Sequence, residues 1–298
     1  MKLSQPKREL LYKPFRESIR GDRLIKLINL MLRSAECGLK NEMNDNNRQI
    51  FLPEMNSVWQ ETLNWQPTAQ QKQQFQKLYE LIIVGNKKFN LTRITTPKDF
   101  WEKHLWDSLR GIKFILENPI NLPKVKKVID IGTGAGFPGL PVAIIVPQYA
   151  VTLLDATRKK INFIETILVD LNIKNALAIT NRVEKISRVF QYREIYDIAL
   201  LRAVAPTVVC AEYALPLLKI GGITILYRGN LTTDEQANLP EVIKLLGGKI
   251  ESIEAFNTPL SNSIRHCIYL RKVGKTPVNY PRSVGVPNQK PLLSLKKI

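Results

Sequence analysis

VIDIGTGAGFPG, at residues 128–139, is the stretch that decides the fold. Its first four residues form a short apolar run with one acidic side chain, which is typical of a buried strand. The glycines that follow permit a tight turn and let a ligand approach the backbone closely. The apolar run after Gly139 predicts a helix whose first N–H groups can bind a polar ligand. A strand, a glycine loop and a helix in this order indicate a site for a nucleotide-type cofactor.

The spacing of the glycines favours one cofactor over another. Gly132, Gly134 and Gly136 follow the pattern Gly-x-Gly-x-Gly, whereas the dinucleotide fingerprint has its third glycine one residue later. This spacing resembles the loop that binds S-adenosylmethionine. A nicotinamide-dependent oxidoreductase that uses the same loop is the disfavoured alternative.

The sequence around this loop predicts an α/β fold. Short β-branched runs alternate with helical segments, as in a mostly parallel, Rossmann-like sheet flanked by helices. The expected strands are seven, at 127–131, 150–154, 176–180, 196–201, 222–226, 249–256 and 263–271. Only residues 257–262 separate the last two strands, which leaves no room for a crossover helix, so the last strand should be antiparallel.

Two further strand ends carry polar groups that suit a nucleoside cofactor. Asp155 ends the second expected strand, where a carboxylate can accept both ribose hydroxyls. The same side chain could instead cap a helix that begins near Ala156-Thr157, and we favour the ribose role because of the glycine loop. Val183 and Glu184 follow the third strand, at the position where enzymes that bind S-adenosylmethionine on such a sheet usually contact its adenine.

If the cofactor is S-adenosylmethionine, the end of the fourth strand should face the methyl group on its sulfonium. Residues 197–204, DIALLRAV, contain neither an Asn-Pro-Pro-Tyr motif for amino-group methylation nor a nucleophilic cysteine for carbon methylation. A ring nitrogen such as guanine N7 has a free lone pair and needs no base, so positioning of the reactants would supply most of the rate. Arg202 could orient the base or a phosphate, or it could form a plain surface ion pair.

The charge balance points to a polyanionic partner. The chain has 298 residues, with 44 Lys plus Arg against 26 Asp plus Glu and a net charge of +18. Such an excess attracts nucleic acid or an anionic membrane, although it can also serve solubility alone. The three cysteines form no CxxC pair, and no apolar run is long enough to span a bilayer. We therefore expect a cytoplasmic protein with no metal site, no membrane contact and no targeting segment in residues 1–20.

The region before the glycine loop reads as helical. Phe75, Leu78, Leu81 and Ile82 form one apolar stripe, and Pro97 is well placed to open a second helix that ends at Asn118-Pro119. We expect the apolar face of this second helix to comprise Phe100, Trp101, Leu105, Leu109 and Ile112. The expected divisions are a basic extension of unknown role at 1–53, a helical part at 54–122, the sheet domain at 123–273 and a basic, proline-rich tail at 274–298. Within the extension, a helix is expected around residues 24–32, followed by an Asn-rich patch at 41–47, and the tail is expected to be extended chain.

Together these residues resemble one family. The resemblance rests on Asn90-Leu91-Thr92, His104 with Asp107-Ser108, residues 130–139, Leu154-Asp155, Arg182-Val183-Glu184, Arg202-Ala203 and Tyr280-Pro281-Arg282. The chain is similar, over about 54–298, to the small-subunit (16S) ribosomal RNA guanine-N7 methyltransferases, also called glucose-inhibited division protein B. The resemblance implies a class I S-adenosylmethionine-dependent methyltransferase that acts on N7 of a guanine in the 530-loop region of 16S rRNA, free or in the small ribosomal subunit. We expect a monomer.

The resemblance also implies roles for individual residues. Cofactor contacts are expected from Gly132, Gly134, Gly136, Phe137, Asp155, Ala156, Thr157, Val183, Glu184 and Arg202. Asn90, Thr92, His104 and Asp107 would lie near the substrate base, and Asn90, His104, Asp107 and Arg202 are the expected catalytic residues. His104 and Asp107 lie three residues apart, so they could also hydrogen-bond each other as a purely structural pair. The alternative function is a non-catalytic RNA-binding or ribosome-assembly factor on the same fold.

Overall fold

Residues 50–117 and 126–292 are described by the computed structural model, and they contain a seven-stranded sheet. The strands are β1 Lys127–Ile131, β2 Ala150–Asp155, β3 Ala176–Thr180, β4 Tyr196–Arg202, β5 Leu218–Arg228, β6 Gly248–Asn257 and β7 Ile264–Lys272. Their order is β3-β2-β1-β4-β5-β7-β6, with β7 antiparallel to both of its neighbours. The predicted fold class is confirmed, including the antiparallel last strand. Six strands lie within one residue of their expected bounds, and β5 extends beyond its expected range at both ends, from Leu218 to Arg228.

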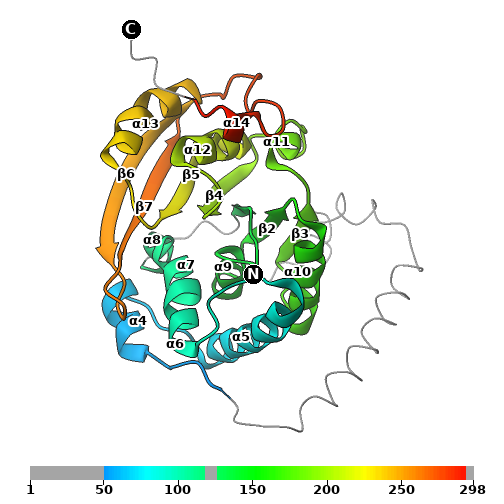
Figure 1. Ribbon diagram of the computed structural model, residues 1–298, viewed down its shortest axis with the longest axis vertical. Coiled ribbons are helices and arrows are strands. Elements are labelled where there is room, and N and C mark those ends of the chain that lie inside the picture. Colours follow the sequence, from blue (N-terminus) through cyan, green and yellow to red (C-terminus); the bar gives the residue numbers. More distant parts are fainter. Residues whose placement is uncertain (1–49, 118–125, 293–298) are drawn as a thin grey trace, which may run out of the picture. The chain divides into compact units, whose positions relative to one another are not determined.

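Helices cover both faces of the sheet (Figure 1). Side chains alternate along each strand, so on β4 Ile198 and Leu200 pack into one core while Ala199 and Leu201 pack into the other. One face is covered by α9 Gly139–Ile145 and α10 Arg158–Asp170 together with the N-terminal helices. The other face is covered by α11 Val183–Ile186, α12 Thr207–Ala214, the 3₁₀ turn η3 Leu215–Leu217 and α13 Thr233–Leu245.

The N-terminal part is helical, as its apolar spacing predicts. Its elements are α4 Asn56–Leu63, α5 Ala69–Phe89, α6 Pro97–Phe100, the π-helix η1 Trp101–Trp106, α7 Asp107–Arg110 and α8 Lys113–Leu116. Thr68 and Gln71 form a capping box at the start of α5, and Pro97 opens α6 after the cap residue Thr96. The expected single second helix is wrong in two respects: its middle is the wider π-helix η1, and the helical run ends at Arg110, with a turn at 111–112 before α8. Such π-turns often mark functional positions.

The tail also differs from the expected extended chain. It folds back onto the sheet domain and contains the short helix α14 Val286–Gln289, which lies beside α11 and α12 (Figure 1). Arg193 donates to the carbonyls of Thr276 and Tyr280, at 3.0 and 2.9 Å. The expected helix at 24–32, the Asn-rich patch and the end at Asn118-Pro119 lie outside the described residues.

Candidate functional site

The glycine loop connects β1 to α9 in a conformation that requires glycine. Gly132 has φ +71°, and a Cβ there would lie 2.8 Å from the Val204 side chain. Gly136 has φ +98°, and its Cβ would lie 2.2 Å from the Leu140 side chain. Both positions combine left-handed backbone with close contacts, so other residues would be strained there. The loop therefore has the compact shape that its sequence predicts.

Buried Asp130 stabilises the glycine loop through two hydrogen bonds. Its Oδ2 accepts hydrogen bonds from Thr133 Oγ1 at 2.6 Å and from the Gly139 N–H at 2.8 Å. Burial raises the pKa of Asp130 to about 6 despite these bonds. Asp130 belongs to the sequence motif, but its hydrogen bonds to Thr133 and Gly139 could be seen only in the folded loop.

Asp155 at the end of β2 holds the other side of the loop. Its Oδ2 accepts from the Gly134 N–H at 3.0 Å, and its Oδ1 accepts from the Thr157 N–H at 2.8 Å. Thr157 is the N-cap residue of α10, so Asp155 organises this helix start without being the cap itself. A carboxylate offers about four lone-pair positions, so these two bonds leave acceptor capacity for a ligand. The bond to Thr157 and a ribose-binding role are therefore compatible.

A hollow of about 380 Å³ lies beside the loop and Asp155. Six of the expected cofactor residues line it, namely Gly132, Asp155, Ala156, Thr157, Val183 and Glu184. Gly134, Gly136, Phe137 and Arg202 are not among its lining residues. Arg182, from the motif Arg182-Val183-Glu184, also lines the hollow. The sequence did not point to the other lining residues Asn181, Tyr213, Gly285, Asn288 and Gln289. The last three come from the tail, whose approach to the hollow is a property of the tertiary fold.

Arg202 forms the centre of a second group of side chains, between β4 and η1. Its Nη1 donates to the Lys103 carbonyl at 2.7 Å and to Asp107 Oδ2 at 2.9 Å. Its Nη2 lies 3.1 Å from His104 Nδ1. The expected direct pair of His104 and Asp107 is thus replaced by a bridge through Arg202. The guanidinium is held by three acceptors and is not a plain surface ion pair.

These contacts fix the state of His104. Arginine only donates, so Nδ1 of His104 accepts, and the ring proton is on Nε2, which lies 2.9 Å from Thr92 Oγ1. Burial, reinforced by the Arg202 charge, lowers the pKa of His104 to about 3. The imidazole is therefore neutral at physiological pH and both of its nitrogens are occupied, which suits a positioning role.

The remaining predicted residues lie around this group. Phe137 is buried, and its ring stacks on His104 with centroids 4.3 Å apart. Phe137 therefore connects the glycine loop to η1. Asn90 ends α5 with a left-handed backbone conformation and an exposed side chain. Among the contacts of residues 50–117 and 126–292, none brings the Asn90 side chain to Arg202 or His104.

Glu102 is a further buried acid on η1 that sequence reasoning missed. It accepts backbone N–H bonds from Leu260 at 2.6 Å and Ser261 at 2.8 Å. These bonds fasten the β6–β7 turn to the helix that carries His104. A single Glu next to Lys103 gave no signal of this partner, which lies 158 residues away.

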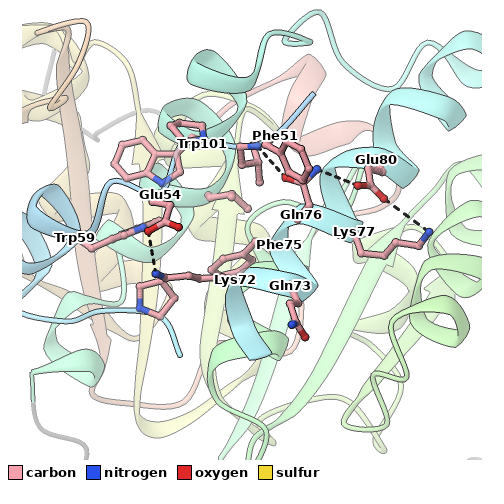
Figure 2. A pocket seen from close by; sticks show the side chains of 14 residues that line it. Phe51, Glu54, Trp59, Lys72, Gln73, Phe75, Gln76, Lys77, Glu80 and Trp101 are labelled. Carbon is pink, nitrogen blue, oxygen red and sulfur yellow. Dashed lines mark hydrogen bonds and ion pairs between the residues drawn. The ribbon is translucent and has the colours of Figure 1, made fainter. Parts of the chain in front are cut away.

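A second hollow, of about 430 Å³, lies among α4, α5 and η1 (Figure 2). Trp59, Phe75 and Trp101 contribute to an aromatic wall. The charged groups at its rim pair with one another, as in the contacts of Lys72 with Glu54 at 3.5 Å and of Lys77 with Glu80 at 3.8 Å. The glycine loop and the strand ends line the first hollow and not this one.

Within the described ranges, no three His, Cys, Asp or Glu side chains are grouped so that they could hold a metal ion. No helix in those ranges combines the length and apolarity needed to cross a bilayer.

Comparison with known proteins identifies the family. Residues 71–268 match the family model described as GidB, rRNA small subunit methyltransferase G. The chain belongs to the GidB family. A ribosomal RNA small subunit methyltransferase G from Trichodesmium erythraeum is 85% identical over 256 residues, which cover 86% of this chain and all of that protein. The protein of the same description from Nostoc punctiforme is 62% identical over 243 residues, covering 81% of this chain and 99% of that one.

A more distant resemblance, of the fold alone, is to a solved structure. An rRNA methylase from Streptococcus thermophilus is 20% identical with a TM-score of 0.39, and the match covers 51% of this chain and 89% of that one. The resemblance inferred from the sequence motifs is therefore confirmed by the close relatives and the family model.

Proposed function

We propose that this GidB-family chain transfers the methyl group of S-adenosylmethionine to N7 of a guanine in 16S rRNA. The observation that carries the proposal is the position of the Arg202 group. It lies at the carboxyl end of β4, next to the β1 and β2 ends that line the first hollow. In open α/β sheets, ligands bind at the carboxyl ends of strands where the strand order reverses, which here is between β1 and β4.

The first hollow fits the cofactor. Its volume lies within the range of about 300–1,000 Å³ that is usual for small-molecule sites. Asp155 can accept from ribose hydroxyls, the glycine loop can pass close to the amino-acid part, and Val183 offers an apolar contact to adenine. When bound, S-adenosylmethionine supplies an electrophilic methyl group on a sulfonium.

The Arg202 group suits methylation of a nitrogen that carries no proton. Guanine N7 has a free lone pair, so no general base is required, and neutral His104 has no free nitrogen to act as one. Arg202 has five N–H groups, and three are directed to Lys103, Asp107 and His104. The other two can donate to guanine O6 and orient the base. Catalysis then consists of holding two reactants in line.

The charge of the chain fits an RNA partner. The excess of +18 would draw the phosphate backbone to the protein and speed the encounter. Tail residue Arg282, however, pairs with Glu212 at 2.7 Å and so does not serve as a free phosphate contact. We further propose that the protein is a cytoplasmic monomer. In this proposal the helical part, 54–122, contributes residues near the substrate base. The sheet domain, 123–273, and the tail, 274–298, contribute the cofactor site.

The test is methyl transfer to small-subunit RNA. Purified protein, methyl-labelled S-adenosylmethionine and unmodified 16S rRNA or small subunits are incubated, and the RNA is digested to nucleosides. Label in 7-methylguanosine is expected, and label in another nucleoside would refute the N7 assignment. Cofactor and RNA binding without transfer would support the alternative of a non-catalytic assembly factor.

A further inference from the structure

We propose that the tail completes the cofactor site: Asn288 and Gln289 bind the adenine of the cofactor, and Glu212 is the residue that positions them. The inference rests on the proposed function, since it concerns the same hollow. It adds a specificity-determining element that lies outside the glycine loop and the strand ends.

The tail forms part of the wall of the first hollow. Gly285, Asn288 and Gln289 line it together with Val183 and Glu184. Both amide side chains are exposed, and within the described residues neither has a hydrogen-bond partner. A primary amide presents one acceptor and two donors, which match the amino group and a ring nitrogen of adenine. The hollow thus contains two unused amides of the type that reads adenine.

The tail also meets the adenine end of the hollow. The Gly285 N–H donates to Glu184 Oε1 at 3.0 Å, and the Tyr213 hydroxyl donates to the same oxygen at 3.4 Å. Glu184 is on α11, which follows β3, whereas the ribose acceptor Asp155 ends the neighbouring strand β2. The contact therefore places the start of α14 against the wall that the base would touch.

A buried ion pair holds the tail in this place. Glu212, on α12, is fully buried, and its carboxylate accepts from the Arg282 backbone N–H at 2.8 Å, from Nε at 2.9 Å and from Nη2 at 2.7 Å. Arg188 adds a bond to the Pro281 carbonyl at 2.7 Å. A buried carboxylate is costly without its partner, so the pair disfavours release of the tail. Glu212 lines no part of the hollow and acts only through Arg282.

The experiment measures nucleoside binding by the full chain. Titration calorimetry with S-adenosylhomocysteine, adenosine and inosine compares the wild type with the double variant Asn288→Ala, Gln289→Ala. Inosine has a carbonyl in place of the adenine amino group. A matched control replaces two exposed amides that do not line the hollow, Gln70→Ala and Asn162→Ala.

The wild type should prefer adenosine to inosine. The tail variant should bind S-adenosylhomocysteine at least fivefold more weakly and lose most of this preference, while the control keeps both. Glu212→Gln should reproduce the tail variant's loss of preference, with circular dichroism confirming that it folds. If Glu212→Gln does not fold, the tail variant still decides the test, because it changes only exposed side chains.

The outcomes separate the two proposals. Failure of the wild type to bind S-adenosylhomocysteine would overturn the proposed function and the inference with it. Normal wild-type binding, with affinity and adenosine preference in the tail variant within twofold of the wild type, would overturn the inference alone.

Discussion

Replacement of Asp155 by asparagine is the change whose effect can be worked out most fully. The carboxylate accepts from Gly134 and Thr157 at 3.0 and 2.8 Å, and it retains lone pairs for ribose hydroxyls. Asparagine keeps the shape, but its NH₂ group must face one of these N–H donors. Loss of a charged acceptor costs about 1–3 kcal/mol, or roughly 5- to 150-fold in affinity for the cofactor. The loop bond adds about 1 kcal/mol of lost stability.

The assay is calorimetric titration of Asp155→Asn with S-adenosylhomocysteine, beside thermal unfolding of the free protein. Asp197→Asn is the matched control, because Asp197 also accepts a backbone N–H, from Lys127 at 2.8 Å, but at the amino ends of the strands. The control should bind within twofold of the wild type. Unchanged affinity in Asp155→Asn would show that the ribose is bound elsewhere, and the assignment of the hollow would be wrong.

Three further predictions concern the Arg202 group and the charge of the chain. Arg202→Lys should lower kcat about 100-fold because the guanine base is misplaced. The affinity for S-adenosylhomocysteine should stay within threefold of the wild type. An equal loss of kcat and of this affinity would contradict a substrate-side role for Arg202. The unfolded chain takes up a proton on His104 near pH 6.5 and the folded chain only near 3, so wild-type stability should fall on acidification through this window. His104→Asn should lose less over the same range in thermal unfolding at several pH values, and parallel curves would contradict the low pKa. RNA affinity should fall about 100-fold or more between 50 and 200 mM salt in filter binding, and a flat response would assign the +18 charge to solubility.

The sequence predicted what local patterns encode. Alternating β-branched runs located all seven strands, and the glycine spacing located the loop beside Asp155. Of the expected helical stripe, Phe75, Leu78 and Ile82 are buried and Leu81 is half-buried. These features depend on neighbours close in the chain, so they can be read without a structure.

Contacts between distant residues could not be predicted in this way. Arg202 meets His104 across 98 residues, and Glu212 meets Arg282 across 70. The π-helix was also missed, because an apolar stripe of one or two turns does not distinguish its wider turn from an α-helix. The expected direct bond between His104 and Asp107 assumed α-helical spacing, and the structure joins them through Arg202 instead.

The central claim is that the hollow between β1, β2 and α11 holds the methyl donor. A crystal structure of the protein with S-adenosylhomocysteine tests it most directly. We predict density for the nucleoside in this hollow, with the ribose hydroxyls on Asp155 and the sulfur facing Arg202. Density for the ligand at another place, or an empty hollow at saturating ligand, would contradict the account.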